Sequence, residues 1–192
     1  MIKNVLKIVF LGVIGFAFLV YLTAPKERVI QKQENRLSKN IAYLSSHFEI
    51  IGESNYFRKE VLFPKGKEKT IIVLNHDALA VFNELDKYTN KDIILVANIS
   101  QTPWVIKKLA VDGKLEELYK DTNNKLINDS SGDFVRVLGL NSIIQNKYYV
   151  YKVQKDGSIE KSFEGEVKLD AMQKGISKLE KTSILKALSL KL

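Results

Sequence analysis

The residues YVYKVQKDGSI at 149–159 decide the fold of this 192-residue chain. They place an Asp156-Gly157 pair between two runs of β-branched and aromatic residues, a pattern that predicts two antiparallel strands joined by a tight turn. Two further pieces precede this hairpin, DSSGDF at 129–134 and LGL at 138–140. A short helix is expected between them.

Alternating strand and helix signals lie upstream of the hairpin. Residues 70–74 are a continuous apolar run, typical of a strand buried on both faces of a parallel sheet, and residues 93–99 predict a second buried strand. Apolar residues from Ala78 to Tyr88 have helical spacing, and Asp77 stands where a helix N-cap is expected. A second helix is expected to begin at Thr102-Pro103. The predicted order is β-α-β-α, then β-β, then a final helix from Leu169.

These pieces and their order resemble the thioredoxin-like superfamily, in particular its TlpA-type and peroxiredoxin-type domains, over residues 69 to about 180. The resemblance implies an α/β fold with a central mixed sheet flanked by helices. It also implies a W-C-x-x-C site after the first central strand and a cis-proline near Lys147. The junction here reads LNHDAL at 74–79, and the chain has no cysteine and no proline near residue 147. Because the thiolate is the nucleophile of disulfide exchange, redox chemistry of that kind is excluded.

An uncharged stretch of 17 residues, 8–24, lies near the start of the chain after Lys3 and Lys7. Its length is at the lower end for a membrane-spanning helix. A cleaved signal peptide is the alternative, but Pro25 directly follows the candidate cleavage site at Ala24. The sequence therefore predicts an uncleaved single-pass anchor, placed in a bacterial inner membrane.

The side of the membrane that the domain occupies is left open by the charges. The short tail with two lysines before the span favours a periplasmic domain, which is our expectation. Five basic residues between Lys26 and Lys39 follow the span and favour the cytoplasm under the positive-inside rule.

Residues 25–48 contain no glycine, their proline is the first residue, and they predict a juxtamembrane helix. Its apolar residues Ile30, Leu37, Ile41 and Leu44 follow a heptad-like spacing. The helix is expected either to pack on its own domain or to form a short coiled coil with a second chain. These four residues, together with the single tryptophan, Trp104, are the candidate partner-binding residues. Trp104 is expected either to pack in the core near the start of a helix or to act as an exposed interface anchor, a role in which tryptophan is frequent.

The chain is thus expected to have four parts. They are a transmembrane anchor (1–24), a juxtamembrane helix (25–48), a thioredoxin-like domain (49–180) and a C-terminal amphipathic tail (181–192).

The net charge of +8 comes from 26 lysines and only 4 arginines against 22 acidic residues. Arginine is the usual reader of phosphates and guanine edges, and the lysines alternate with glutamates, so nucleic acid is not an expected partner. The lysines instead indicate a solvated surface that is attracted to anionic lipid.

One set of residues favours an enzyme of another class. His76 and Asp77 lie where a strand end meets a helix, Ser100 follows the next strand, and such crevices bind ligands in open α/β sheets. His47 is the only other histidine, and neither metal-ligand spacing nor a glycine-rich phosphate loop is present, so no cofactor and no metal are expected.

Our main hypothesis is a non-enzymatic, membrane-anchored, non-redox protein-binding module. It would act as an accessory, scaffold or chaperone-like subunit of an inner-membrane machine such as a secretion system, flagellar motor or division complex. Its expected partners are membrane lipid, other proteins of that complex and, in one alternative, a second copy of itself. The alternative hypothesis is an enzyme of a non-thiol class that uses the crevice of His76, Asp77 and Ser100.

Overall fold

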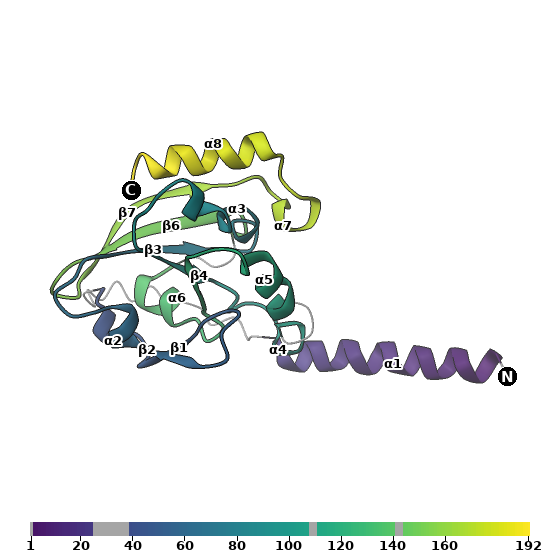
Figure 1. Cartoon of the computed structure of the whole chain (residues 1–192). Coiled ribbons are helices and arrows are strands. Elements are labelled where there is room, and N and C mark those ends of the chain that lie inside the picture. The colour runs from purple at the N-terminus through teal and green to yellow at the C-terminus, as the bar shows by residue number, and fades with distance from the viewer. Residues whose placement is uncertain (1, 25–38, 108–110, 141–143) are drawn as a thin grey trace.

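A five-stranded mixed sheet forms the centre of the domain (Figure 1). The computed structural model describes residues 2–24, 39–107, 111–140 and 144–192. The strands are β3 (Lys69–Leu74), β4 (Ile93–Ala97), β5 (Lys125–Asn128), β6 (Lys147–Val153) and β7 (Ile159–Glu166), in the order β5-β4-β3-β6-β7. β3, β4 and β5 are parallel, whereas β6 is antiparallel to β3 and β7 is antiparallel to β6.

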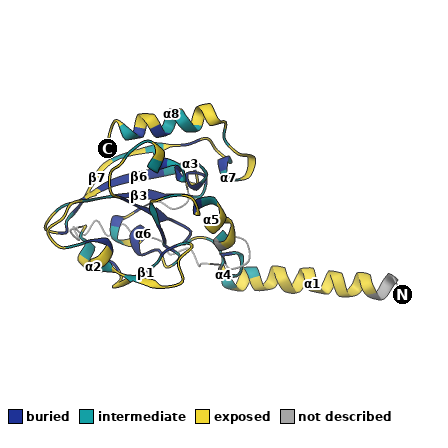
Figure 2. Cartoon of the chain, in the orientation of Figure 1, coloured by how far each residue is buried: buried dark blue, intermediate teal, exposed yellow. Residues whose placement is uncertain are grey.

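Two layers cover the sheet, one on each face (Figures 1 and 2). One layer holds α3 (Leu79–Phe82), the 3-10 turn η2 (Leu85–Lys87), α5 (Asp112–Tyr119), α7 (Ala171–Lys174) and α8 (Lys178–Ser189). The other holds the 3-10 turn η1 (Ile41–Tyr43), the hairpin of β1 (His47–Glu49) and β2 (Tyr56–Arg58), α2 (Lys59–Leu62) and α6 (Asp133–Leu138).

The central strand β3 shows why both faces are apolar. Ile72 and Leu74 belong to one buried cluster and Ile71 and Val73 to the other, as the two-residue period of a strand requires. None of these four side chains is exposed. A strand of this kind needs a helical layer on each side, and the apolar run is therefore continuous rather than alternating.

The predicted fold class is confirmed by this topology. A β-α-β unit is followed by an antiparallel hairpin and a final helix, which is the thioredoxin-like order that the sequence indicated. The hairpin turns at Asp156-Gly157, where Gly157 has φ 86° and the Asp156 carboxylate accepts the amide of Ser158 at 2.9 Å. β5 adds a third parallel strand beside β4.

The juxtamembrane helix predicted to reach Phe48 is wrong for residues 39–48. Lys39 and Ile41 exchange backbone hydrogen bonds with Ile159 and Gly157 at the start of β7, and β1 begins at His47. Pairing with a sheet edge far along the chain therefore overrides the helical spacing of this segment. Residues 25–38, with the rest of the predicted helix, lie outside the described residues.

The last helix crosses the domain boundary expected at residue 180. α8 is continuous from Lys178 to Ser189, and its Leu185 and Leu188 are buried against α3 and the sheet. A capping box begins it, in which the Ser177 hydroxyl accepts the Glu180 amide and the Glu180 carboxylate accepts the Ser177 amide. Residues 181–192 thus continue a helix that packs on the domain.

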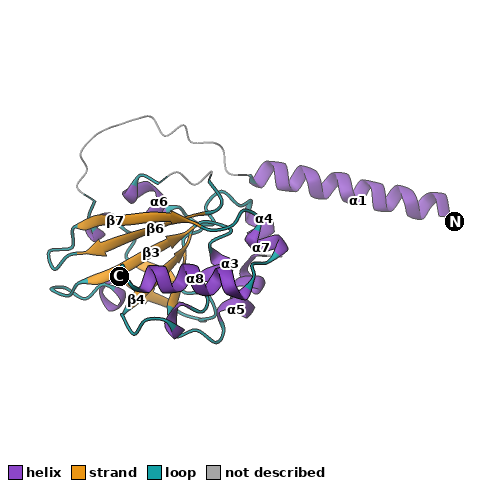
Figure 3. Cartoon of the chain, turned by 90° about the horizontal axis from the view of Figure 1, so that it is seen from above, coloured by secondary structure: helices purple, strands orange, loops and turns teal. Residues whose placement is uncertain are grey.

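The N-terminal helix α1 (Ile2–Thr23) extends away from the domain (Figure 3). Its stretch Val5–Thr23 is long and apolar enough to cross a membrane, a test that a signal sequence passes as well. At its domain end α1 contacts α4 (Trp104–Ile106), the short helix that follows β4.

Candidate functional site

Polar residues directly follow each of the three parallel strands. Asn75 comes after β3, Asn98 after β4 and Asp129 after β5, and all three side chains are buried. Because the strands are parallel, these residues lie at one edge of the sheet, which we call the carboxyl edge. Ligand sites of open α/β sheets favour this edge, so it is the place to look for chemistry.

At β3 and β4 the polar side chains bond to one another. The Asn98 amide donates to the Asn75 side-chain oxygen at 2.8 Å, and the Ser100 hydroxyl donates to the Asn98 side-chain oxygen at 2.9 Å. Asn75 in turn donates to the backbone carbonyl of Ile144 at 2.6 Å. Buried amides need such partners, and here they find them within the protein. The network therefore joins two strand ends to the loop that leads into β6.

Asp77 is a capping residue, but it caps a different helix from the one predicted. Its carboxylate accepts the backbone amides of Asp170 at 2.9 Å and Met172 at 3.3 Å, at the start of α7. α3 begins after Ala78 without a side-chain cap. With only 2% of its side chain exposed, Asp77 links the end of β3 to a loop some ninety residues later in the chain.

His76 is the more accessible half of the predicted acid–base pair. Its side chain is 41% exposed, and its Nδ1 lies 3.4 Å from an Asp77 oxygen. That nitrogen has no hydrogen-bond partner among the described residues. Ser100 bonds to Asn98, and no hydrogen bond between Ser100 and His76 is present in the described part of the chain. The three residues share one edge, but only His76 and Asp77 are brought together.

Asp129 is a buried carboxylate that our sequence analysis treated only as part of a fold motif. It accepts the amides of Asp133 at 2.7 Å, Phe134 at 3.2 Å and Val135 at 3.4 Å, and so caps the amino end of α6. Burial raises its pKa to about 6, despite these three donors. The sequence signal that could have identified Asp129 as a capping residue was an aspartate just ahead of a helix start, followed by a glycine. In the structure that glycine, Gly132, adopts φ 73°.

Neighbouring charges at this edge are also held within the protein. Asp133 accepts hydrogen bonds from Ser45 and Arg136. Burial acts to raise the pKa of Asp133, but these bonds outweigh it and hold the pKa below its usual value. The Lys107 ammonium donates to the Ser130 carbonyl at 2.9 Å, and Lys107 is only 9% exposed.

The predicted partner-binding residues fall into three groups. Leu44 is 4% exposed and belongs to the core cluster under α6, and Ile41 packs against the same cluster. Ile30 and Leu37 lie outside the described residues. Trp104 begins α4, next to α1. Leu44 is thus a core residue, while a role for the others in partner binding stays a prediction.

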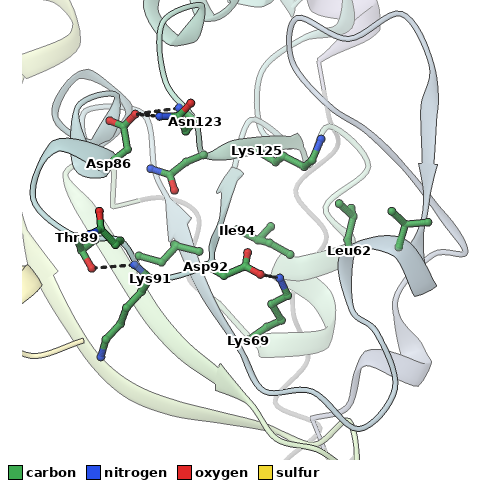
Figure 4. Close-up of a pocket in the computed structure, with 13 residues that line it drawn as sticks. Leu62, Lys69, Asp86, Thr89, Lys91, Asp92, Ile94, Asn123 and Lys125 are labelled. Atoms are coloured by element: carbon green, nitrogen blue, oxygen red, sulfur yellow. Dashed lines mark hydrogen bonds and ion pairs between the residues drawn. The ribbon is translucent and has the colours of Figure 1, made fainter.

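Cavities occur at the opposite edge of the sheet (Figure 4). One, of about 450 Å³, is lined by charged and amide side chains, among them the Lys69–Asp92 ion pair and Asp86, which accepts the amide of Asn123 at 2.9 Å. A second, of about 460 Å³, shares Asn123 to Lys125 with it. Neither is lined by His76, Asp77 or Ser100. Among the described residues no group of three histidine, aspartate or glutamate side chains is placed to hold a metal ion.

Comparison with solved structures finds thioredoxin-fold proteins at low identity. A structure of MTB dsbF in mixed oxidized and reduced forms is 15% identical, with a TM-score of 0.43, and the match covers 74% of this chain and 97% of that one. Enterococcus faecalis AhpC is 16% identical, with a TM-score of 0.41 and coverage of 76% and 87%. Xanthomonas campestris peroxiredoxin Q is 13% identical, with a TM-score of 0.40 and coverage of 78% and 93%. The fold assignment rests on the strand order described above.

Two other comparisons give no match. No protein-family model matches the chain, and no curated protein matches its sequence.

Proposed function

We propose that this protein is a membrane-anchored, non-redox thioredoxin-like module that binds other proteins. It would serve as an accessory, scaffold or chaperone-like subunit of a bacterial inner-membrane machine. The observation that carries the proposal is the state of the carboxyl edge, where Asn75, Asn98, Asp77 and Asp129 are bonded to the protein itself.

This bonding bears directly on chemistry at the edge. A general base must reach a substrate proton, and a carboxylate that already accepts two or three backbone amides is poorly placed to do so. Asp77 and Asp129 are both in this position. The chain also has no cysteine. A domain that keeps the fold but uses these groups to hold itself together is suited to binding rather than to group transfer.

The anchor supports a role at a membrane. No charged residue lies between Ile8 and Ala24, and the Thr23 hydroxyl donates to the carbonyl of Leu19 at 2.9 Å. A polar side chain that is hydrogen-bonded inside its own helix can lie at the boundary of the hydrocarbon region. We place the domain on the periplasmic side, and a phosphatase or fluorescent reporter fused after Leu192 tests that side directly.

The test of the proposal is affinity purification of the full chain from detergent-solubilised membranes, with stoichiometry measured by mass spectrometry. We expect one or more membrane-complex proteins at a fixed ratio, or a second copy of this chain. Recovery of the chain alone, as a monomer, would argue strongly against a binding module.

A matched pair of variants tests the segment before the domain. Ile30→Asp with Leu37→Asp should reduce recovery of the partner, whereas Gln31→Asp with Gln33→Asp adds the same charge at polar positions and should not. Equal recovery from both would remove Ile30 and Leu37 from the binding surface and leave Ile41 and Trp104 as the remaining candidates.

A further inference from the structure

We propose that the carboxyl edge of the domain docks onto the phospholipid bilayer, with α4 and the loop 168–170 lying in its interfacial region. The inference rests on the proposed anchoring of the chain by α1. It adds that the domain is held against the lipid surface by its own side chains rather than suspended above it.

The first observation is the position of α4 along α1. α4 contacts α1, and in the described part of the span only Val20 and Thr23, both near its end, are partly shielded from solvent. The remaining span residues are exposed and available to lipid. Since Thr23 is the last residue of the membrane-spanning stretch, a helix packed beside it lies at the depth of the lipid headgroups.

The second observation is that α7 extends about as far toward the proposed membrane as α4 does. In Figures 1 and 3 α4 and α7 lie on the side of the domain from which α1 extends. α4 is beside the last turn of α1, whereas α7 is set apart from α1 in Figure 1 but reaches about as far in the direction in which α1 extends. A membrane that encloses α1 therefore meets this side of the domain. The two cavities described above lie at the opposite edge of the sheet, away from this side.

The composition of α4 suits an interface. Its three residues are Trp104, Val105 and Ile106, and tryptophan is enriched at the headgroup level of membranes. The next residue, Lys107, is only 9% exposed, and its ammonium donates to the Ser130 carbonyl inside the protein. The Lys107 ammonium is thereby held against the protein.

The loop before α7 presents a single apolar side chain. Leu169 is 65% exposed, although the amide of the next residue is hydrogen-bonded to Asp77. Asp170 beside it has φ 59°, the only positive value among described non-glycine residues, and its amide is fixed by Asp77. An exposed leucine side chain is not stabilised by contact with water. Its entry into a membrane interface removes apolar surface from water, which is favourable.

The charges around Leu169 select phospholipid as the occupant. Lys168 is exposed directly before it, and Lys174 lies on α7, where it pairs with Asp170 at 2.7 Å. An apolar tip with Lys168 beside it matches a bilayer surface, where the tip meets acyl chains and the Lys168 ammonium meets phosphates. The docked edge is continuous with the lipid-facing surface of α1, which a separate protein groove would not be.

The single tryptophan makes the test direct. We would reconstitute the full chain into phosphatidylcholine vesicles, with and without phosphatidylglycerol, and record Trp104 emission. If α4 lies in the interface, lipids brominated near the headgroup should quench most of this emission, aqueous iodide should quench little of it, and the maximum should be blue-shifted. Strong iodide quenching without bromolipid quenching would overturn the docking.

A second reporter tests the loop. Trp104→Phe with Leu169→Trp moves the fluorophore to residue 169, and bromolipid quenching is expected there too. The matched control is Trp104→Phe with Tyr56→Trp, because Tyr56 is 70% exposed on β2 in the covering layer of the other face. This control should be quenched by iodide alone. If residues 169 and 56 respond alike to both quenchers, the loop is not docked.

Carbonate washing separates this inference from the anchoring on which it rests. A chain that stays in the washed membrane but shows iodide-quenched Trp104 is anchored without being docked. A chain released by carbonate would overturn the anchor and the docking together.

Discussion

Asp77→Ala is the substitution that best distinguishes a structural role of Asp77 at the carboxyl edge from a catalytic one. In the structure Asp77 holds the amides of Asp170 and Met172 and thereby fixes the start of α7 to the end of β3. If it were instead a poised acid or base, its loss would affect activity and leave stability largely unchanged.

The magnitude follows from the two contacts. A hydrogen bond to a charged group contributes about 1.5–3 kcal/mol, and the 3.3 Å contact to Met172 is longer and weaker than the 2.9 Å contact to Asp170. We therefore expect Asp77→Ala to cost about 2–4 kcal/mol, because two buried amides also lose their acceptor. For a domain of this size that lowers Tm by roughly 5–15 °C.

The assay is thermal and urea unfolding of the full chain in detergent, followed by circular dichroism, with hydrogen exchange measured at residues 168–172. Asp92→Ala is the control, since Asp92 is a 76% exposed aspartate paired with Lys69 at the opposite edge, and its loss should cost less than about 1 kcal/mol. Equal Tm values for the two variants, or unchanged protection of the amides of residues 170 and 172, would refute the capping role.

Three further predictions concern stability. Ser177→Ala should destabilise α8 by about 1 kcal/mol in urea unfolding, because it removes the capping box with Glu180. Leu44→Ala should cost about 2–4 kcal/mol by the same measurement, whereas Tyr43→Ala, at a 54% exposed position, should cost little; the reverse order would return Leu44 to an intermolecular seam. Burial raises the pKa of Asp129 from 3.8 to about 6, so the folded state binds the carboxyl proton more tightly than the unfolded state does. The protonated carboxyl therefore contributes to stability below pH 4, and this contribution is lost as the pH rises through 6. The stability of the protein relative to Asp129→Asn should accordingly fall by about 2–3 kcal/mol between pH 4 and pH 7.

The parts of the fold that were predictable from sequence are those encoded locally. The Asp156-Gly157 turn and its flanking strands follow from a two-residue signal and a short period, and both are present in the structure. β3 and β4 were likewise visible as uninterrupted apolar runs. β5 spans only four residues, so its register beside β4 depends on a neighbour that the local pattern does not reveal.

The errors arose where distant segments meet. Residues 39–48 have helical spacing, but Lys39 and Ile41 find hydrogen-bond partners at the start of β7 and in the turn before it, more than a hundred residues away. Asp77 has the sequence context of a cap for the next helix, yet its carboxylate reaches the amides before α7. In each case the local preference is worth less than the bonds formed by tertiary contact, and one sequence alone does not show those contacts.

The two hydrogen bonds of Asp77 have consequences for both chemistry and lipid contact. By accepting the amides of Asp170 and Met172, Asp77 gives up the free carboxylate that an acid–base role requires, and it fixes the loop that holds Leu169 outward. The occupied Asp77 carboxylate and the outward position of Leu169 would then have one structural cause. Asp77→Ala in the Leu169→Trp reporter background should therefore weaken bromolipid quenching at residue 169, because a loosened loop samples water. In the wild-type tryptophan background the same substitution should leave Trp104 quenching intact, since α4 is held by α1 rather than by Asp77. Equal loss at both positions would mean that Asp77 supports the whole edge and not this loop alone.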